Sequence, residues 1–208
     1  MIYDISPPLS ASTPVWPDDV PLTRQVALDI EQGDFATLSS LSATLHLGAH
    51  VDAPSHYRPG GPAIGNLSLE PFIGLCEVIS LDVSRGATIS ASALPRTIRA
   101  PRVLIRTGTG SRNGNFHTNF AALSLTLIEE LASRGCVLIG IDTPSVDLYD
   151  SKSLLAHHAC DRANIAILEG LELDTVPPGL YELIALPLRL IDFEASPVRA
   201  ILRTLDND

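Results

Sequence analysis

The sequence has few cysteines, few basic residues and no long apolar run, and each scarcity excludes a class of protein. Cys76, Cys136 and Cys160 form an odd and unpatterned set, which fits reduced, buried thiols rather than a disulfide framework or a zinc finger. Fourteen lysines and arginines stand against 24 aspartates and glutamates, and the formal net charge is −10. Because no basic cluster offsets this charge, we expect no nucleic-acid partner.

The sequence also lacks transmembrane, signal-peptide and linker segments, and these absences bear on where the protein is located and how many domains it has. No apolar run reaches the length of a transmembrane helix, so no membrane partner is expected. Residues 1–5 lack the basic and apolar regions of a signal peptide, which favours a cytoplasmic location. With 45% apolar and 18% charged residues and no linker, the chain is expected to form one globular domain over residues 1–208. A small-molecule partner is the most plausible.

The strongest functional signal is the eleven-residue stretch from His46 to His56. His46, His50, Asp52 and His56 are separated by even numbers of positions, so on a strand and its extended continuation all four side chains would leave one face. Imidazole and carboxylate groups bind borderline divalent metals such as zinc or manganese. The alternative is a set of ordinary strand or loop histidines, but such clustering is rare in an apolar strand. The pattern favours a catalytic metal site.

A second group of ligand-type residues comes from much later in the chain. Residues 154–160 are predicted to be helical and carry His157 and His158, and a predicted strand over residues 164–168 delivers Glu169. Carboxylates can bridge two ions through their two oxygens. Two divalent ions about 3.5–4 Å apart can share a hydroxide and polarise a carbonyl, which is the chemistry of hydrolysis. A mononuclear site remains an alternative.

Three further residues have open roles. His56 lies beyond the bend at Pro54, where a free imidazole could transfer protons, or it could be another ligand. Asp142 follows a predicted buried strand, and it is either a partner of a metal ligand or the start of an Asx turn. Trp16 lies between two prolines, where its ring either projects rigidly from a loop or fills the edge of the core.

The apolar patterns predict a strand-rich α/β chain with few helices. The second predicted strand of a hairpin, residues 35–45, is expected to run directly into the metal-ligand stretch. Residues 58–62 are expected to form a surface loop over the site. A glycine-rich segment, residues 108–114, lacks the Gly-Lys-Ser/Thr ending of a phosphate loop. Strands are predicted at residues 21–30, 35–45, 76–83, 103–107, 136–141, 164–168, 181–188 and 196–202, and helices at 90–94, 124–134 and 154–160.

The run His46-x-Gly48-Ala49-His50-x-Asp52-x-Pro54-x-His56 resembles the signature of the cyclase-like metal-dependent hydrolases. Within that family the chain is similar to the bacterial kynurenine formamidases, also called arylformamidases. This more specific resemblance extends over nearly the whole chain. It rests on residues 3–9, 13–17, 140–145, 151–153, 167–169 and 196–200.

The resemblance implies a particular assignment of the site. It implies two zinc ions per subunit, with Mn²⁺ or another divalent ion as the alternative. It places His157, rather than its neighbour His158, on the second ion, because the twelve-residue distance from His157 to Glu169 resembles the family's spacing. It implies His56 as the proton donor and acceptor and Trp16 as a substrate contact. The implied ligands are His46, His50 and Asp52 on the first ion, His157 on the second, and Asp52 and Glu169 shared between them.

The resemblance also implies a fold and a reaction. The fold is an α/β, swivelling β/β/α domain with a mixed, strand-rich central sheet and few helices, usually assembled as a homodimer. The reaction is hydrolysis of N-formyl-L-kynurenine to L-kynurenine and formate in tryptophan degradation, by a metal-bound hydroxide. The alternatives are a related amide or lactam hydrolase that opens isatin, and a metal-stabilised binding protein without catalysis.

Overall fold

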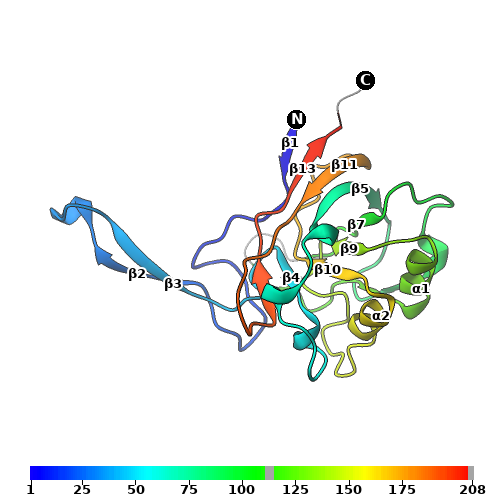
Figure 1. Ribbon diagram of the computed structural model, residues 1–208, viewed down its shortest axis with the longest axis horizontal. Helices are drawn as coiled ribbons and strands as arrows, with labels where there is room; N and C mark the ends of the chain where they lie inside the picture. The colour runs from blue at the N-terminus through cyan, green and yellow to red at the C-terminus, as the bar shows by residue number, and fades with distance from the viewer. Residues whose placement is uncertain (111–114, 206–208) are drawn as a thin grey trace.

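A nine-stranded mixed sheet forms the centre of the computed structural model, which describes residues 1–110 and 115–205 (Figure 1). The four middle strands are parallel, and antiparallel strands extend the sheet on both sides. This arrangement confirms the expected mixed, strand-rich sheet. The strand order is β1 (Ile2–Asp4), β13 (Ile201–Thr204), β11 (Gly179–Ile184), β5 (Ile73–Ser80), β7 (Arg102–Arg106), β9 (Leu138–Ile141), β10 (Ala166–Glu169), β4 (His50–Asp52) and β12 (Ala195–Pro197).

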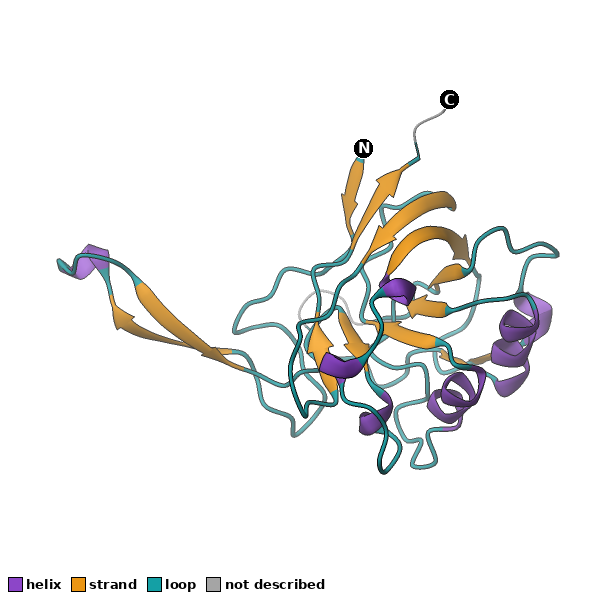
Figure 2. Cartoon of the chain, viewed as in Figure 1, coloured by secondary structure: helices purple, strands orange, loops and turns teal. Residues whose placement is uncertain are grey.

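Two α-helices, α1 (Leu125–Ser133) and α2 (Leu155–Ala163), pack against each other on one side of this sheet (Figure 2). The Ser124 side chain caps α1 by accepting a hydrogen bond from the Leu127 amide at 3.1 Å, as its position in the sequence suggests. Two of the three predicted helices are therefore confirmed, and α2 extends three residues beyond its predicted end. The predicted helix at 90–94 is a single 3₁₀ turn. The 3₁₀ helices are η1 (Ile30–Gln32), η2 (Pro54–His56), η3 (Ile64–Asn66), η4 (Glu70–Phe72) and η5 (Ala91–Ala93).

The core lies on both faces of the sheet, because β9 is buried completely. Ile139 and Ile141 point into the cluster under the two helices, whereas Leu138 joins the cluster on the opposite face. This double burial explains why β9 reads as a continuous apolar run. All three cysteines are free and buried, which confirms their interpretation as packing residues. No helix among the described residues is long and apolar enough to cross a membrane.

A hairpin of β2 (Thr23–Leu28) and β3 (Leu38–Ser42) extends away from the sheet (Figure 1). Both strands are shorter than predicted, and β3 does not run into the metal-ligand stretch. That prediction was wrong, because residues 43–49 form a connection of bends that carries the chain from the hairpin back to the sheet. A second small sheet pairs β6 (Thr88–Ile89) with β8 (Ala122–Leu123) in parallel.

The predicted strand at residues 196–202 is two strands in different parts of the sheet. β12 pairs with β4 at one edge, and β13 lies between β1 and β11 near the other edge. The two hydrophobic stretches are close in sequence, so the pattern alone did not separate them. Pro197 ends β12 at an edge position, where its missing amide hydrogen does not interrupt a ladder. The strand predicted at 181–188 is β11, which begins at Gly179 and ends at Ile184.

Candidate metal centre

The register of two strands builds the centre of the site. In the antiparallel pairing of β4 with β10, His50 lies directly opposite Glu169, so their side chains share one face of the sheet. Asp52 is two positions further along β4 and points to the same side. The distance from His50 Nε2 to Glu169 Oε2 is 3.2 Å. The prediction that evenly spaced side chains leave the same face of the strand is therefore confirmed for His50 and Asp52.

The other two histidines of the motif arrive by different backbone routes. His46 lies in the connection before β4, and its Nδ1 is 3.1 Å from Asp52 Oδ1. His56 lies in η2, beyond Pro54. A shared strand face does not explain their approach, and the expectation that one extended segment holds all four residues was wrong. Gly48 bends the connection with a φ of +59°, a conformation that favours glycine.

The structure brings His157 and Glu169 to the same place, and it selects His157 over His158. His157 Nε2 lies 3.2 Å from Asp52 Oδ2 and 3.7 Å from Glu169 Oε1. Both imidazoles lie beside Tyr57, with centroid distances of 5.2 Å for His157 and 6.0 Å for His158, but the contacts with the two carboxylates are made by His157. His50, Asp52, His157 and Glu169 are each at most 3% exposed. Four ionisable side chains thus converge in a buried position beside His46.

The donor set fits a divalent cation. His50 Nε2 and Asp52 Oδ1 are buried and lie 3.6 Å apart, and neither makes a hydrogen bond of good geometry among the described residues, although Glu169 and His46 lie 3.2 Å and 3.1 Å from them. A buried polar atom without a well-formed hydrogen bond is costly, and a metal ion would satisfy both atoms at once. Two overlapping groups have ligand atoms within 4.8 Å of one another: His46, Asp52 and His56, and His50, Asp52 and Glu169.

The charges in this cluster support the same conclusion. Burial disfavours a charged imidazole at His50, but Glu169 and Asp52 outweigh that effect and raise the pKa of His50 to about 9. His157 is also buried, and its contacts with Asp147 and Asp52 raise its pKa to about 10. Burial opposes the charged form of Asp52, yet its pKa is lowered by His157 and His46. The carboxylates therefore create a strongly negative field that would attract a cation.

His56 differs from the buried residues because its side chain is exposed. Its ring centroid lies 4.3 Å from that of His46 and 5.8 Å from that of His157. This position suits proton exchange with water or substrate, but it also permits coordination in the group with His46 and Asp52. The proton-transfer role of His56 stays a prediction.

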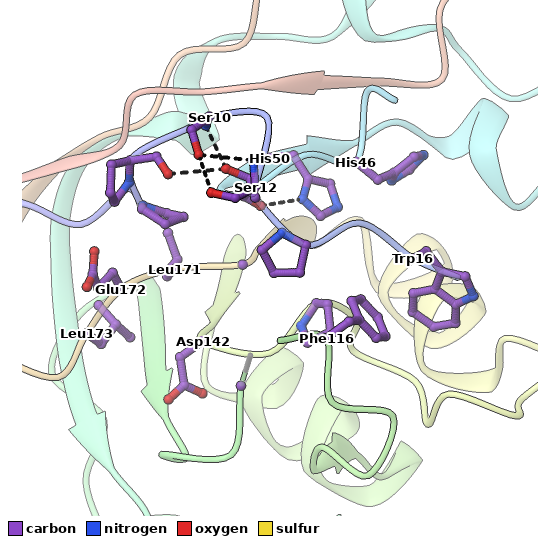
Figure 3. A pocket seen from close by; sticks show the side chains of 18 of the residues that line it. Ser10, Ser12, Trp16, His46, His50, Phe116, Asp142, Leu171, Glu172 and Leu173 are labelled. Carbon is purple, nitrogen blue, oxygen red and sulfur yellow. Dashed lines mark hydrogen bonds between the residues drawn. The ribbon is translucent and has the colours of Figure 1, made fainter. Parts of the chain in front are cut away.

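A cavity of about 590 Å³ opens in front of the cluster (Figure 3). His46 and His50 line it, together with the rings of Trp16 and Phe116. Trp16 is half-buried, stacks on Tyr149 at a centroid distance of 4.9 Å and also packs against the buried Phe120 at 6.1 Å, so its ring both lines the cavity and packs at the edge of the core. Phe116 was not identified from the sequence, because it lies in a polar loop without any periodic pattern. The aromatic wall suits a flat ring in the substrate.

Two expectations about the surroundings were wrong. The loop at residues 58–62 does not line the cavity, and Arg58 instead pairs with Asp161 on α2 at 2.7 Å. Asp142 fits neither interpretation that the sequence offered. Its carboxylate accepts hydrogen bonds from the Thr107 and Gly108 amides, which follow β7, and it cannot form an Asx turn because residue 144 is a proline without an amide hydrogen. The partner of His157 is Asp147, at 2.7 Å from Nδ1, which the sequence analysis missed.

Comparisons with known proteins show what the chain as a whole is similar to. The family model described as "Putative cyclase" matches residues 3–148. The kynurenine formamidases of Bordetella pertussis strain Tohama I and Bordetella bronchiseptica strain RB50 are each 45% identical over 206 residues, covering 98% of this chain and 98% of their own.

Solved structures show the same fold. A protein described as a potential metal-dependent hydrolase with cyclase activity has a TM-score of 0.83 and 26% identity, over 97% of this chain and 96% of its own. Isatin hydrolase A from Labrenzia aggregata has a TM-score of 0.82 at 22% identity, over 99% of this chain and 94% of its own, which shows likeness of fold alone.

Proposed function

This chain belongs to the cyclase family of metal-dependent hydrolases, and from that premise we propose that it hydrolyses N-formyl-L-kynurenine to L-kynurenine and formate. One observation carries the proposal: a buried His/Asp/Glu cluster borders a cavity whose wall contains the rings of Trp16 and Phe116. The cluster suits hydrolysis of an amide, and the rings suit an aryl group. The full-length similarity to kynurenine formamidases supports this choice of substrate.

The proposed site holds two zinc ions, with Mn²⁺ or another divalent ion as the alternative. Both carboxylates support two ions, because each presents its two oxygens to different imidazoles. Asp52 faces His46 through Oδ1 and His157 through Oδ2, and Glu169 faces His50 through Oε2 and His157 through Oε1. His46, His50 and Asp52 would hold the first ion and His157 the second, with Asp52 and Glu169 shared. Ions bound there would lower the pKa of a water molecule and stabilise negative charge on the formyl oxygen.

The chain's own residues supply orientation and proton transfer. Trp16 and Phe116 would pack against the aryl ring and direct the formamide toward the cluster. As water adds to the formyl carbon and the C–N bond breaks, the aniline nitrogen needs a proton. His56 is the exposed imidazole beside the cluster, and it would give that proton and later receive one from water.

We propose that the protein is a homodimer that uses the β2–β3 hairpin. A two-stranded hairpin is marginally stable by itself, and no other strand or helix among the described residues makes extensive contact with it. It nevertheless exposes several large apolar side chains. These are Val26, Ile30, Phe35, Leu38 and Leu41, with Phe35 89% exposed. A second copy of the chain would bury them.

We also propose a cytoplasmic location. The three cysteines are free and buried, which is compatible with a reducing compartment.

Steady-state rates on two substrates test the proposed reaction. The purified protein is expected to hydrolyse N-formyl-L-kynurenine with a kcat/KM far above that for isatin. Negligible hydrolysis of N-formyl-L-kynurenine beside efficient opening of isatin would contradict it and favour a lactam hydrolase. Metal analysis of the same preparation is expected to find two zinc ions per chain, and one ion would require a mononuclear site.

A further inference from the structure

The short segment that follows β9 contacts two of the three proposed ligands of the second ion, His157 and Glu169. Asp147 Oδ2 accepts hydrogen bonds from His157 Nδ1 at 2.7 Å and from the His157 backbone amide at 3.1 Å. The neighbouring Val146 amide donates to Glu169 Oε1 at 2.7 Å. Residues 146 and 147 therefore orient one imidazole and one carboxylate that come from different elements, α2 and β10.

The segment is itself held firmly. The Thr143 hydroxyl donates to the Ser145 carbonyl at 2.8 Å, and the Ser145 hydroxyl accepts from the Asp147 amide at 3.1 Å. All of residues 143 and 145–147 are buried. Buried groups with satisfied hydrogen bonds and close packing have little freedom to move. The Asp147 carboxylate is thus a fixed acceptor rather than a mobile surface group.

The Asp147 carboxylate also caps the start of α2. Leu154, at the N-cap position, has a left-handed backbone and provides no side-chain cap. Asp147 Oδ1 accepts from the Ala156 amide at 3.1 Å, so Asp147 satisfies two amides of the first turn from outside the helix. This capping fixes the first turn of α2, and with it the backbone of His157.

The hydrogen bond to Nδ1 has a chemical consequence for His157. A neutral imidazole carries one proton, and an acceptor at Nδ1 keeps the proton on that nitrogen. The lone pair is then on Nε2, the nitrogen that faces Asp52 and Glu169. We infer that Asp147 is the positioning residue of the second metal ion, because it holds His157 in the tautomer and orientation that bind metal through Nε2. This inference rests on the proposed two-ion site.

Replacement by asparagine separates this role from plain helix capping. The amide of Asp147→Asn has one acceptor oxygen where aspartate has two. If that oxygen keeps the Ala156 amide, the NH₂ group faces His157 Nδ1 and favours the opposite tautomer. If the oxygen faces Nδ1 instead, the NH₂ group opposes the Ala156 amide. The first arrangement removes the tautomer that binds metal, and the second weakens the cap that holds the backbone of His157, so His157 becomes a poorer ligand in both while the side chain keeps its size.

The matched control is Asp142→Asn. Asp142 is another carboxylate that follows β9 and accepts backbone amides, but it makes none of the contacts to His157. Zinc affinity and stoichiometry are measured on the full-length protein by competition with a chelator, and thermal unfolding is measured on the metal-free proteins. We expect Asp147→Asn to weaken one zinc equivalent about 10–100-fold and to leave the other unchanged. Asp142→Asn is expected to keep both equivalents.

The possible outcomes are distinct. If Asp147→Asn keeps both zinc affinities and only unfolds at a lower temperature, Asp147 is a helix cap and the inference is overturned while the proposed function stands. If the wild type binds fewer than two zinc ions, the two-ion proposal fails and the inference fails with it. If the variant does not fold, ¹⁵N NMR of histidine in the zinc-loaded wild type decides. A protonated Nδ1 and a coordinated Nε2 at His157 support the inference, and the reverse contradicts it.

Discussion

The close approach of Gly170 to the metal-ligand segment allows a sharp test of the site's construction. Gly170 follows Glu169 directly and has a φ of +67°. A Cβ atom at this position would lie 2.1 Å from the Gly48 carbonyl oxygen. That oxygen accepts the hydrogen bond from His50 Nδ1 at 2.9 Å. An added methyl group at residue 170 would therefore push on the atom that orients a proposed metal ligand.

The size of the effect can be worked out against a matched control. Gly135 has a similar φ of +79°, but a Cβ atom there would meet nothing within 4 Å. Gly135→Ala therefore carries only the cost of a left-handed alanine, about 1–2 kcal/mol. Gly170→Ala carries the same cost plus overpacking against backbone, which adds about 1–3 kcal/mol. For a chain of this length, 1 kcal/mol corresponds to about 2–4 °C in Tm.

Thermal unfolding and zinc titration of the two variants supply the test. We expect Gly170→Ala to unfold roughly 2–12 °C below Gly135→Ala. We also expect Gly170→Ala to bind zinc more weakly than the wild type, because displacement of Gly48 misaligns His50. Gly135→Ala is expected to keep the wild-type zinc affinity. Equal Tm values and equal zinc affinities for the two variants would refute this account of how β10 and the segment before β4 fit together.

Four further predictions follow from the proposed function. Removal of metal by a chelator should abolish hydrolysis, with the circular dichroism spectrum largely kept and activity restored by zinc; unfolding would indicate a structural metal instead. His56→Ala should lower kcat about 10²–10⁴-fold while two zinc ions remain bound, and loss of one zinc would show that His56 is a ligand. Trp16→Ala should raise KM about tenfold, and Trp16→Phe should recover most of the loss; equal KM values would exclude a contact with the aryl ring. Replacement of Phe35 and Leu41 by serine should convert a dimer into a monomer in sedimentation velocity, whereas an unchanged dimer would place the interface elsewhere.

The sequence predicts the parts of the fold that depend on local pattern. The spacing of Leu127, Ile128 and Leu131, which places them on one face of a helix, identifies α1. The unbroken apolar run of β9 identifies a strand buried on both faces. The sequence does not reveal that the stretch at 196–202 divides into the edge strand β12 and the strand β13, which lies between β1 and β11 at the other side of the sheet. Strand partners that are far apart in sequence are fixed by tertiary packing, and no local pattern records them.

The candidate site also has one part that could be predicted from local sequence and another that depends on tertiary packing. Ligand-type residues are recognisable from their chemistry and spacing, so His50, Asp52 and Glu169 could be identified from the sequence. Asp147 could not, because its role depends on where α2 begins relative to the loop after β9. The connection between β9 and α2 contains three aspartates, Asp142, Asp147 and Asp150, and only the structure shows which one contacts His157. A residue that hydrogen-bonds to a metal ligand need not stand at any fixed distance from that ligand in the sequence.

Some proposed ligands are positioned by paired strands and one is positioned by the start of a helix, so the two proposed ions are expected to differ in affinity. His50 and Glu169 are buried and lie opposite each other across the paired strands β4 and β10, so their relative position is fixed by the ladder itself. His157 depends on a helix start and on a single carboxylate, Asp147. Because local opening is easier at a helix end than within a sheet, the ion held through His157 should be the one that dissociates first. Stepwise removal of zinc with increasing chelator should therefore show two unequal affinities in the wild type, and Asp147→Asn should widen the gap between them.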